Sequence, residues 1–337
     1  MRKRLSILPI VLLLFIFMGG FTNVSAAEKK IIWKFQTFIP ETDADWYVTL
    51  KSMKALIEEG SGGKIEVKIF PVGVLTDPDS IIDTVVNGAI QGGQILSGMA
   101  ADRAPSSLGT EMPYGTKDMY EHFELHFLWG LIDIMREEYA KRNLHLLTVG
   151  FSGQVNFFST FPVKSIGDFK GKKIWVMPQL AWLTKFGAAT VEVPGMDMYT
   201  ALKLGTLDGF AWTIGELEYG NFKEVVKYVM RPKFITPGTH IIINKKAWDK
   251  LGKPLQTQIQ DHILANQFKV YKEYRSYDLK SIKAAQDYGV KFIDLPPADV
   301  SKLKAAADEF WNEVEGMSPG ASKMIKRYRE FLKYKGR

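Results

Sequence analysis

The sequence predicts an α/β protein whose two lobes are tied together by one long helix. After Lys30 it alternates strand-like and helix-like stretches, which is the pattern of sheets covered by helices. Residues 254–288 form one helical stretch with no Gly or Pro after its first position, and a helix of that length spans ~50 Å. Because this exceeds the width of one lobe, we expect the helix to join two.

The N-terminus has the three parts of a secretory signal peptide. Basic residues at 2–4 precede an apolar run over 5–21, which is too short for a comfortable membrane span, and small residues follow at 24–26. We therefore predict a cleavable signal peptide over residues 1–26 and a mature protein in the periplasm. Because the chain contains no cysteine, we expect neither a lipid-anchored N-terminus nor disulfides.

The charge distribution argues against a nucleic-acid partner. The formal net charge is +7, and the predicted signal peptide carries three basic and no acidic residues, so the mature chain carries +4. Lys and Arg are dispersed among acids, and no basic block is interleaved with aromatic residues. No later apolar run reaches membrane-spanning length. We therefore expect a protein that is free in the periplasm.

The first elements follow from local patterns. Residues 31–37 and 65–70 alternate or run apolar over strand length, and residues 46–59 between them have helical spacing that stops at Gly60. The segment 60–64 is rich in Gly but lacks the spacing and the Ser or Thr of a phosphate-binding loop. We interpret it as a helix C-cap that leads into a strand.

The same patterns continue along the chain, with turn residues between the elements. We predict further strands over residues 93–96, 144–150, 155–159, 173–177 and 238–243. We predict further helices over residues 78–87, 119–142, 179–186 and 198–204. The long helix follows these elements and ends at Gly289.

Residues that enzymes commonly use do not form a convincing group. His122 and His126 lie four apart on a predicted helix, where both rings could share one face, but Phe123 stands where a zinc protease has Glu. A solvated helix face is therefore favoured over a metal site. The run GFSG at 150–153 approaches a serine nucleophile motif without matching it. We predict no catalytic residue, no metal and no cofactor.

Aromatic residues near the ends of predicted strands are more informative. Phe38 follows the first strand, Trp175 lies on a later strand, and Trp212 comes a few residues after the 199–209 segment. In α/β sheets, ligands bind in the crevice outside the carboxyl ends of the strands. These side chains are therefore candidates for ligand contacts, with core packing as the alternative.

Six stretches form a recognisable series along the mature chain. They are SGGKIEV at 61–67, PVGVL at 71–75, NGAIQGG at 87–93, IGDFKGKKI at 166–174, YTALKLGTLDG at 199–209 and NKKAWDKL at 244–251. In this order they resemble the solute-binding proteins of TRAP (tripartite ATP-independent periplasmic) transporters. The likeness covers nearly all of the mature chain.

This resemblance implies a two-lobed periplasmic binding protein, type II-like, in which hinge strands and the long helix join α/β lobes around a ligand. It places residues 27–151 and 238–277 in lobe 1 and residues 152–237 and 278–337 in lobe 2. Ligand binding would close the lobes by rotation. The implied partners are a small-molecule solute and the membrane subunits of a TRAP transporter. We expect a monomer that is not an enzyme.

One departure from the family concerns the ligand. The family usually has Arg directly after the 166–174 run, where it binds a substrate carboxylate, and this chain has Trp175. With a period of two along a strand, Trp175 and Met177 share one face. The same parity puts Gln154 and Asn156 together on the preceding strand. Gln154 matches a polar ligand contact in the branch of the family that binds keto acids.

Two further candidates follow from the missing arginine. Arg103 could supply the positive charge if its loop reaches the ligand, and Glu216 could supply oxygens for a bound cation. Ala211 and Thr236 stand where the keto-acid branch commonly has acidic residues, which argues against that cation. We therefore predict a small organic solute, an organic acid with an aromatic or apolar body, held by amide donors and stacked against Trp175 and Trp212.

Two alternatives assign different functions to the chain. A periplasmic metal-dependent hydrolase would use His122 and His126, and its activity would vanish with a chelator. A binding protein for an ATP-driven importer or for a sensor would have the same fold and pocket. Neighbouring genes for two TRAP membrane subunits would distinguish the latter from a TRAP receptor.

Overall fold

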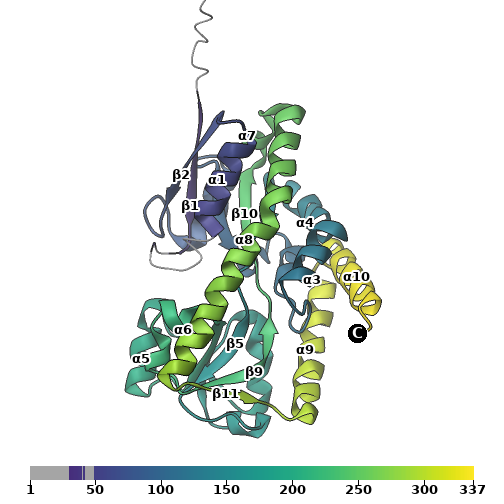
Figure 1. Ribbon diagram of the computed structural model, residues 1–337. Coiled ribbons are helices and arrows are strands. Elements are labelled where there is room, and N and C mark those ends of the chain that lie inside the picture. The colour runs from purple at the N-terminus through teal and green to yellow at the C-terminus, as the bar shows by residue number, and fades with distance from the viewer. Residues whose placement is uncertain (1–29, 40, 42–48) are drawn as a thin grey trace, which may run out of the picture.

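The computed structural model describes residues 30–39, 41 and 49–337, and it contains two β-sheets covered by helices (Figure 1). The predicted signal peptide over residues 1–26 lies outside these ranges. The first sheet has five strands in the order β2-β1-β3-β10-β4. β1 pairs in parallel with β2 and β3, and β10 pairs antiparallel with β3 and β4. The strands are β1 Ile31–Thr37, β2 Ile65–Phe70, β3 Gly92–Leu96, β4 Leu144–Val149 and β10 Thr239–Asn244.

The second sheet has six strands in the order β11-β9-β5-β8-β6-β7. β5 is antiparallel to both β8 and β9, and β6 is parallel to β8. The strands are β5 Val155–Ser159, β6 Lys173–Trp175, β7 Ala189–Thr190, β8 Gly209–Thr213, β9 Tyr228–Ile235 and β11 Lys291–Asp294. The fold class predicted from the sequence, two α/β lobes, is confirmed.

Helices cover both sheets, and one predicted helix is divided. The α-helices are α1 Lys51–Gly60, α2 Ile81–Val86, α3 Met119–Phe123, α4 Leu131–Ala140, α5 Met198–Leu204, α6 Glu216–Tyr219, α7 Lys245–Asp249, α8 Gly252–Tyr288, α9 Pro297–Met317 and α10 Pro319–Tyr334; the 3₁₀ helices used below are η4 Pro105–Thr110 and η7 Pro178–Phe186. The prediction of one helix over 119–142 is wrong because Gly130 adopts the left-handed conformation, with φ 71°, between α3 and α4. Within the described ranges, no helix combines the length and apolar character needed to cross a bilayer.

The long helix α8 packs against both halves of the molecule, as the sequence predicts (Figure 1). Ile259 and Ile263 belong to the core under the first sheet, where α8 contacts α1. Further along, α8 contacts α6 beside the second sheet. There the hydroxyl of Ser281 donates to the carbonyl of Ile214 at 2.8 Å. One continuous helix therefore braces both sheets.

Two chain segments cross between the sheets side by side. One leads from β4 to β5, and the other leads from β9 to β10. The N–H of Gly150 donates to the carbonyl of Thr239 at 2.7 Å, and the N–H of Ser152 donates to the carbonyl of Pro237 at 3.0 Å. These paired segments lie where the sequence-based interpretation expects hinge strands.

The two C-terminal helices pack on different halves of the molecule. α9 contacts η7 beside the second sheet, whereas α10 contacts α4 and η4 beside the first. Met324 of α10 shares a core with Leu125 and Leu131. The division predicted from the sequence gave all of residues 278–337 to lobe 2. Because α10 packs on elements of lobe 1, we propose assigning it to that lobe.

Candidate ligand-binding site

A small cavity of about 60 Å³ lies between the two sheets, beside the crossing segments. The ends of β1, β3, β5 and β8 contribute to its wall, as does α8. Val155 and Thr213 lie opposite each other in the β5–β8 register, and both line the cavity. The lining residues are Phe38, Ile39, Leu96, Glu111, Ser152, Val155, Met177, Trp212, Thr213, Pro237, Thr239 and Tyr274.

Four of the predicted site residues come together at this cavity. Phe38, Met177 and Trp212 line it. The ring of Trp175 lies 5.2 Å from that of Trp212, centroid to centroid, with 56° between the planes. Trp175 is also packed against the cores on both faces of the second sheet. Trp175 therefore supports the wall through Trp212, which is the tryptophan that lines the cavity.

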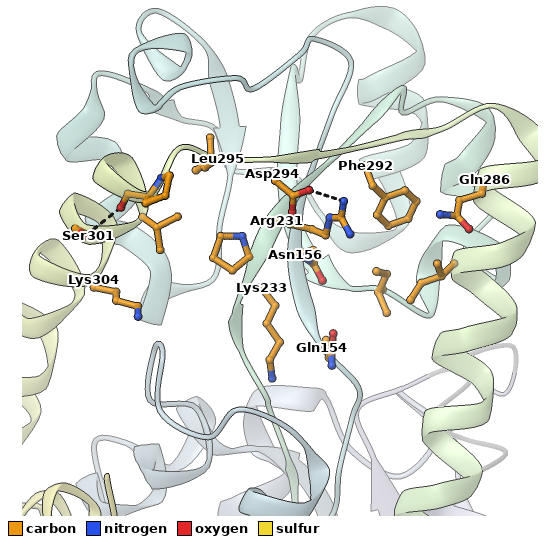
Figure 2. Close-up of a pocket in the computed structure, with 15 residues that line it drawn as sticks. Gln154, Asn156, Arg231, Lys233, Gln286, Phe292, Asp294, Leu295, Ser301 and Lys304 are labelled. Carbon is orange, nitrogen blue, oxygen red and sulfur yellow. Dashed lines mark hydrogen bonds and ion pairs between the residues drawn. The ribbon is translucent and has the colours of Figure 1, made fainter. Parts of the chain in front are cut away.

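Gln154 and Asn156 lie together, but they do not line this cavity. Both line a second pocket of about 710 Å³ on the other face of β5, between α8 and α9 (Figure 2). Successive residues of a strand point to opposite faces, and Val155 between them faces the first cavity. The parity predicted from the sequence is therefore right, although neither amide side chain lines the cavity that Trp212 lines.

Arg103 and Glu216 also lie away from the cavity lining. Arg103 is partly exposed and pairs through Nη2 with Asp83 Oδ2 at 2.9 Å. Glu216 begins α6 and is 9 % exposed, packed beneath Gly220. Because neither residue lines the cavity, the predicted roles of a replacement arginine and of a cation ligand have no geometric support here.

Glu111 is the charged residue of this lining, and the sequence does not predict it. Among the described residues that line the cavity, Glu111 alone is charged. Its side chain is 1 % exposed, and its Oε2 accepts a hydrogen bond from Nε2 of Gln179 in η7. Burial raises the pKa of Glu111 from its usual 4.5 to about 7, although Ser97 and Gln179 oppose the rise through hydrogen bonds. The Glu111–Gln179 bond connects elements beside the two sheets.

His122 and His126 are buried, which corrects the prediction of a solvated helix face. Both are 0 % exposed, and their ring centroids are 4.1 Å apart. Burial lowers the pKa of His126 from 6.5 to about 4, and burial together with the charge of His126 lowers that of His122. Nδ1 of His126 lies 2.7 Å from the carbonyl of His122. The part of the chain that the structure describes holds no group of three His, Cys, Asp or Glu side chains placed for a metal.

A buried carboxyl group lies where α8 passes the crossing segments. Asp278 is 0 % exposed, and its Oδ2 lies 3.4 Å from Nη1 of Arg275. Burial raises the pKa of Asp278 from 3.8 to about 7, with Arg275 and Lys233 acting in the opposite direction. A Cβ on Gly153 would lie 2.6 Å from Asp278 Oδ1. The crossing segment therefore runs in direct contact with the helix that spans both sheets.

Two α/β lobes that are joined by crossing strands and enclose a cavity define a protein that holds a small ligand between its lobes. Residues 37–316 match the DctP family, described as bacterial extracellular solute-binding protein, family 7. The chain therefore belongs to this family. The match confirms the resemblance to TRAP solute-binding proteins that the sequence motifs indicate.

Similar proteins cover the chain almost completely at low identity. A monocarboxylate 2-oxoacid-binding periplasmic protein of Nostoc sp. is 20% identical over 320 residues, which are 93% of this chain and 87% of the relative. A TRAP solute-binding protein of Desulfovibrio salexigens with bound orotic acid has a TM-score of 0.79 at 21% identity, covering 90% of this chain and 99% of that one. A TRAP solute-binding protein of Chromohalobacter salexigens with bound (S)-(+)-2-amino-1-propanol has a TM-score of 0.77 at 22% identity, covering 90% and 96%. These structures establish the shared fold.

Proposed function

We propose that this chain is the periplasmic solute receptor of a TRAP transporter, which takes up a small organic solute between its lobes and delivers it to the membrane subunits. The cavity between the sheets carries this proposal. Both lobes, both crossing segments and α8 contribute residues to the same wall, so one bound solute would contact the two lobes and the hinge between them. The proposal includes a monomeric protein with a cleaved signal peptide and no catalytic activity.

The chemistry of the cavity supports a ligand with an apolar or aromatic body. Phe38, Leu96 and Trp212 provide apolar surface, and a few polar groups lie among them. The relatives named above bind 2-oxoacids or hold orotic acid and an amino alcohol. These ligands are small organic molecules of different charge, so the family fold accepts more than one class of polar group.

Small-molecule binding by the purified protein tests this function. Mass spectrometry of the protein from residue 27 onward, after denaturation, should release a retained organic solute. Adding that solute at a hundred times its Kd should stabilise the folded state by about 2.7 kcal/mol. EDTA should leave this stabilisation unchanged. The proposal fails if no compound of a broad metabolite collection stabilises the protein, or if a hydrolytic turnover is found that EDTA and His126→Ala abolish.

A further inference from the structure

The cavity contains buried hydrogen-bonding atoms without partners in the protein. Among the described residues, Oε1 of Glu111 and Oγ of Ser152 make no hydrogen bond of ordinary geometry, although Ser97 lies close enough to the Glu111 carboxyl group to lower its pKa. Both residues line the cavity, at 1 % and 6 % exposure. Buried polar atoms in folded proteins are nearly always paired. These two atoms therefore mark where polar groups of a ligand would be satisfied.

Positive charge is missing from the described part of this wall. The lining contains Glu111 but no Lys, Arg or His. Nearby bases are engaged elsewhere: Arg275 pairs with Asp278, and Lys233 bonds to Thr236 and lines the second pocket. The sequence from 40 to 48 also holds no Lys, Arg or His. A ligand carboxylate placed here would face Glu111 without a cationic partner, which is an unfavourable arrangement in a buried site.

We infer that the solute carries a protonated amine that pairs with the carboxylate of Glu111, on an apolar or aromatic body that contacts Trp212 and Tyr274. This inference rests on the proposed function and names the ligand class of the same site. An ammonium group donates up to three hydrogen bonds and would satisfy Oε1 with a charge-assisted bond. The aromatic wall adds favourable cation–π contact. An organic acid fits this inference only as a zwitterion whose amine pairs with Glu111 and whose carboxylate points away from that side chain.

The position of Glu111 also couples this recognition to lobe closure. Glu111 follows η4 beside the first sheet, whereas Gln179 lies in η7 beside the second. The bond between their side chains already links the two sides of the cavity. Oε1 of Gln179 has no partner among the described residues. A ligand ammonium that pairs with Oε1 of Glu111 would leave this bond to Gln179 intact and would hold the lobes together through it.

The ionisation of Glu111 makes this binding depend on pH. Because its pKa is raised to about 7, an ammonium ligand must bind the ionised form and displace a proton below that pH. Glu111 acts electrostatically on Tyr139, whose hydroxyl lies 2.7 Å from Nδ1 of His240. Burial raises the pKa of Tyr139 and lowers that of His240 to about 3. Both stay neutral between about pH 5.5 and 8.5. Affinity for an ammonium ligand should therefore rise across this range.

A matched series of probes tests the inference on the mature protein. Benzylamine, benzyl alcohol and benzoate share one body and differ in charge, and isobutylamine, isobutanol and isobutyrate form a smaller set. Calorimetry and thermal shift should show that an amine binds more tightly than its alcohol and its acid. Glu111→Gln should weaken amine binding about ten- to a hundredfold and remove its pH dependence. Glu111→Asp should retain part of the affinity.

Glu138→Gln is the control, because Glu138 is a buried carboxyl group, 8 % exposed, that lies outside the cavity lining. It should leave amine affinity unchanged, and melting temperatures establish that each variant folds. The inference is overturned if an acid is preferred, if no amine binds, or if Glu111→Gln leaves amine binding intact. Because the retained solute is identified independently, a retained acid without an amine would overturn this inference and leave the receptor function standing.

Discussion

Trp212 forms part of the cavity wall while it rests on a second tryptophan. Its ring contacts Trp175, which is fixed between the cores on the two faces of the second sheet. An aromatic side chain held in this way presents a flat surface without loss of further side-chain entropy. Trp212 is therefore the residue whose removal should affect ligand affinity most among the aromatic groups of the cavity.

Trp212→Ala should weaken binding of the retained solute about tenfold or more, because it removes an aromatic contact from the centre of the site. Isothermal titration calorimetry measures this loss. Trp248→Ala is the matched control: Trp248 is 4 % exposed in the core of the first sheet and lies away from the cavity. It should lower the free energy of unfolding by about 3 kcal/mol or more with unchanged affinity. Equal effects of both variants on affinity would contradict the assignment of Trp212 to the site.

Asp278 should make the folded protein less stable as pH rises. Its folded pKa of about 7 lies above the usual 3.8, so between these values the folded state binds more protons than the unfolded state. Stability contributed by this group is therefore lost as pH increases through that window. The free energy of unfolding of Asp278→Asn should therefore rise relative to that of the wild type, by about 1–3 kcal/mol between pH 4 and pH 8. Urea denaturation at several pH values measures this, and a pH-independent difference would exclude the shift.

Site residues are predictable from sequence where a strand pattern fixes them, and not where distant segments meet. The places of Phe38 and Trp212 near strand ends, and the strand parity of Met177 with Trp175, predict three residues that line the cavity. The pairing of Gln154 with Asn156 was also right, but local parity cannot tell which face of a sheet borders a second lobe. Glu111 belongs to no motif, and only the packing of η4 against the other elements brings it to the cavity.

At the scale of elements, the crossing segment between β4 and β5 contains a glycine with little room for a side chain. Gly153 has φ 82°, and an added Cβ would lie 2.6 Å from Asp278 Oδ1 and 3.1 Å from Tyr274 Cε1. Gly205, at φ 72°, has no atom within 4 Å of its ideal Cβ position. Both glycines therefore adopt a left-handed backbone conformation that strains other residues, but only Gly153 lacks room for a Cβ atom.

Gly153→Ala should consequently destabilise the protein by a few kcal/mol, whereas Gly205→Ala should cost only about 1 kcal/mol from the left-handed conformation. Chemical denaturation of the two variants measures the difference. Because Tyr274 lines the cavity, Gly153→Ala should also weaken solute binding, and Gly205→Ala should not. If both variants lose a similar amount of stability, the segment at Gly153 does not pack closely against Asp278 and Tyr274 of α8.

Helices and strands with strong local periodicity were predicted closely. The long helix, predicted over 254–288, begins two residues earlier as α8, and β5 has the predicted bounds. The 119–142 segment kept its helical character but was not predicted to divide at Gly130, since an isolated Gly is compatible with a helix interior at modest cost. Sequence patterns therefore give the type of each element better than its continuity.

At the scale of the whole molecule, the arrangement of the C-terminus depends on long-range packing. α9 starts beside the second sheet, and α10 packs on α4 beside the first (Figure 1). After α8 the chain therefore crosses between the lobes once more, through α9 and α10. No local sequence pattern indicates that α10 packs beside the first sheet. For this reason the division predicted from the sequence places residues 319–337 in lobe 2, whereas we propose from the packing of α10 that they belong to lobe 1.

Small-angle scattering with and without the retained solute tests the central claim most directly, because a ligand that binds between the lobes should draw them together. With solute at saturation, confirmed by calorimetry on the same sample, the radius of gyration should decrease while the molecular mass remains that of one chain. The Trp212→Ala variant, at a solute concentration that no longer saturates it, should show a smaller decrease in the radius of gyration. A saturated protein whose radius of gyration and distance distribution equal those of the free protein would contradict binding by closure of the two lobes.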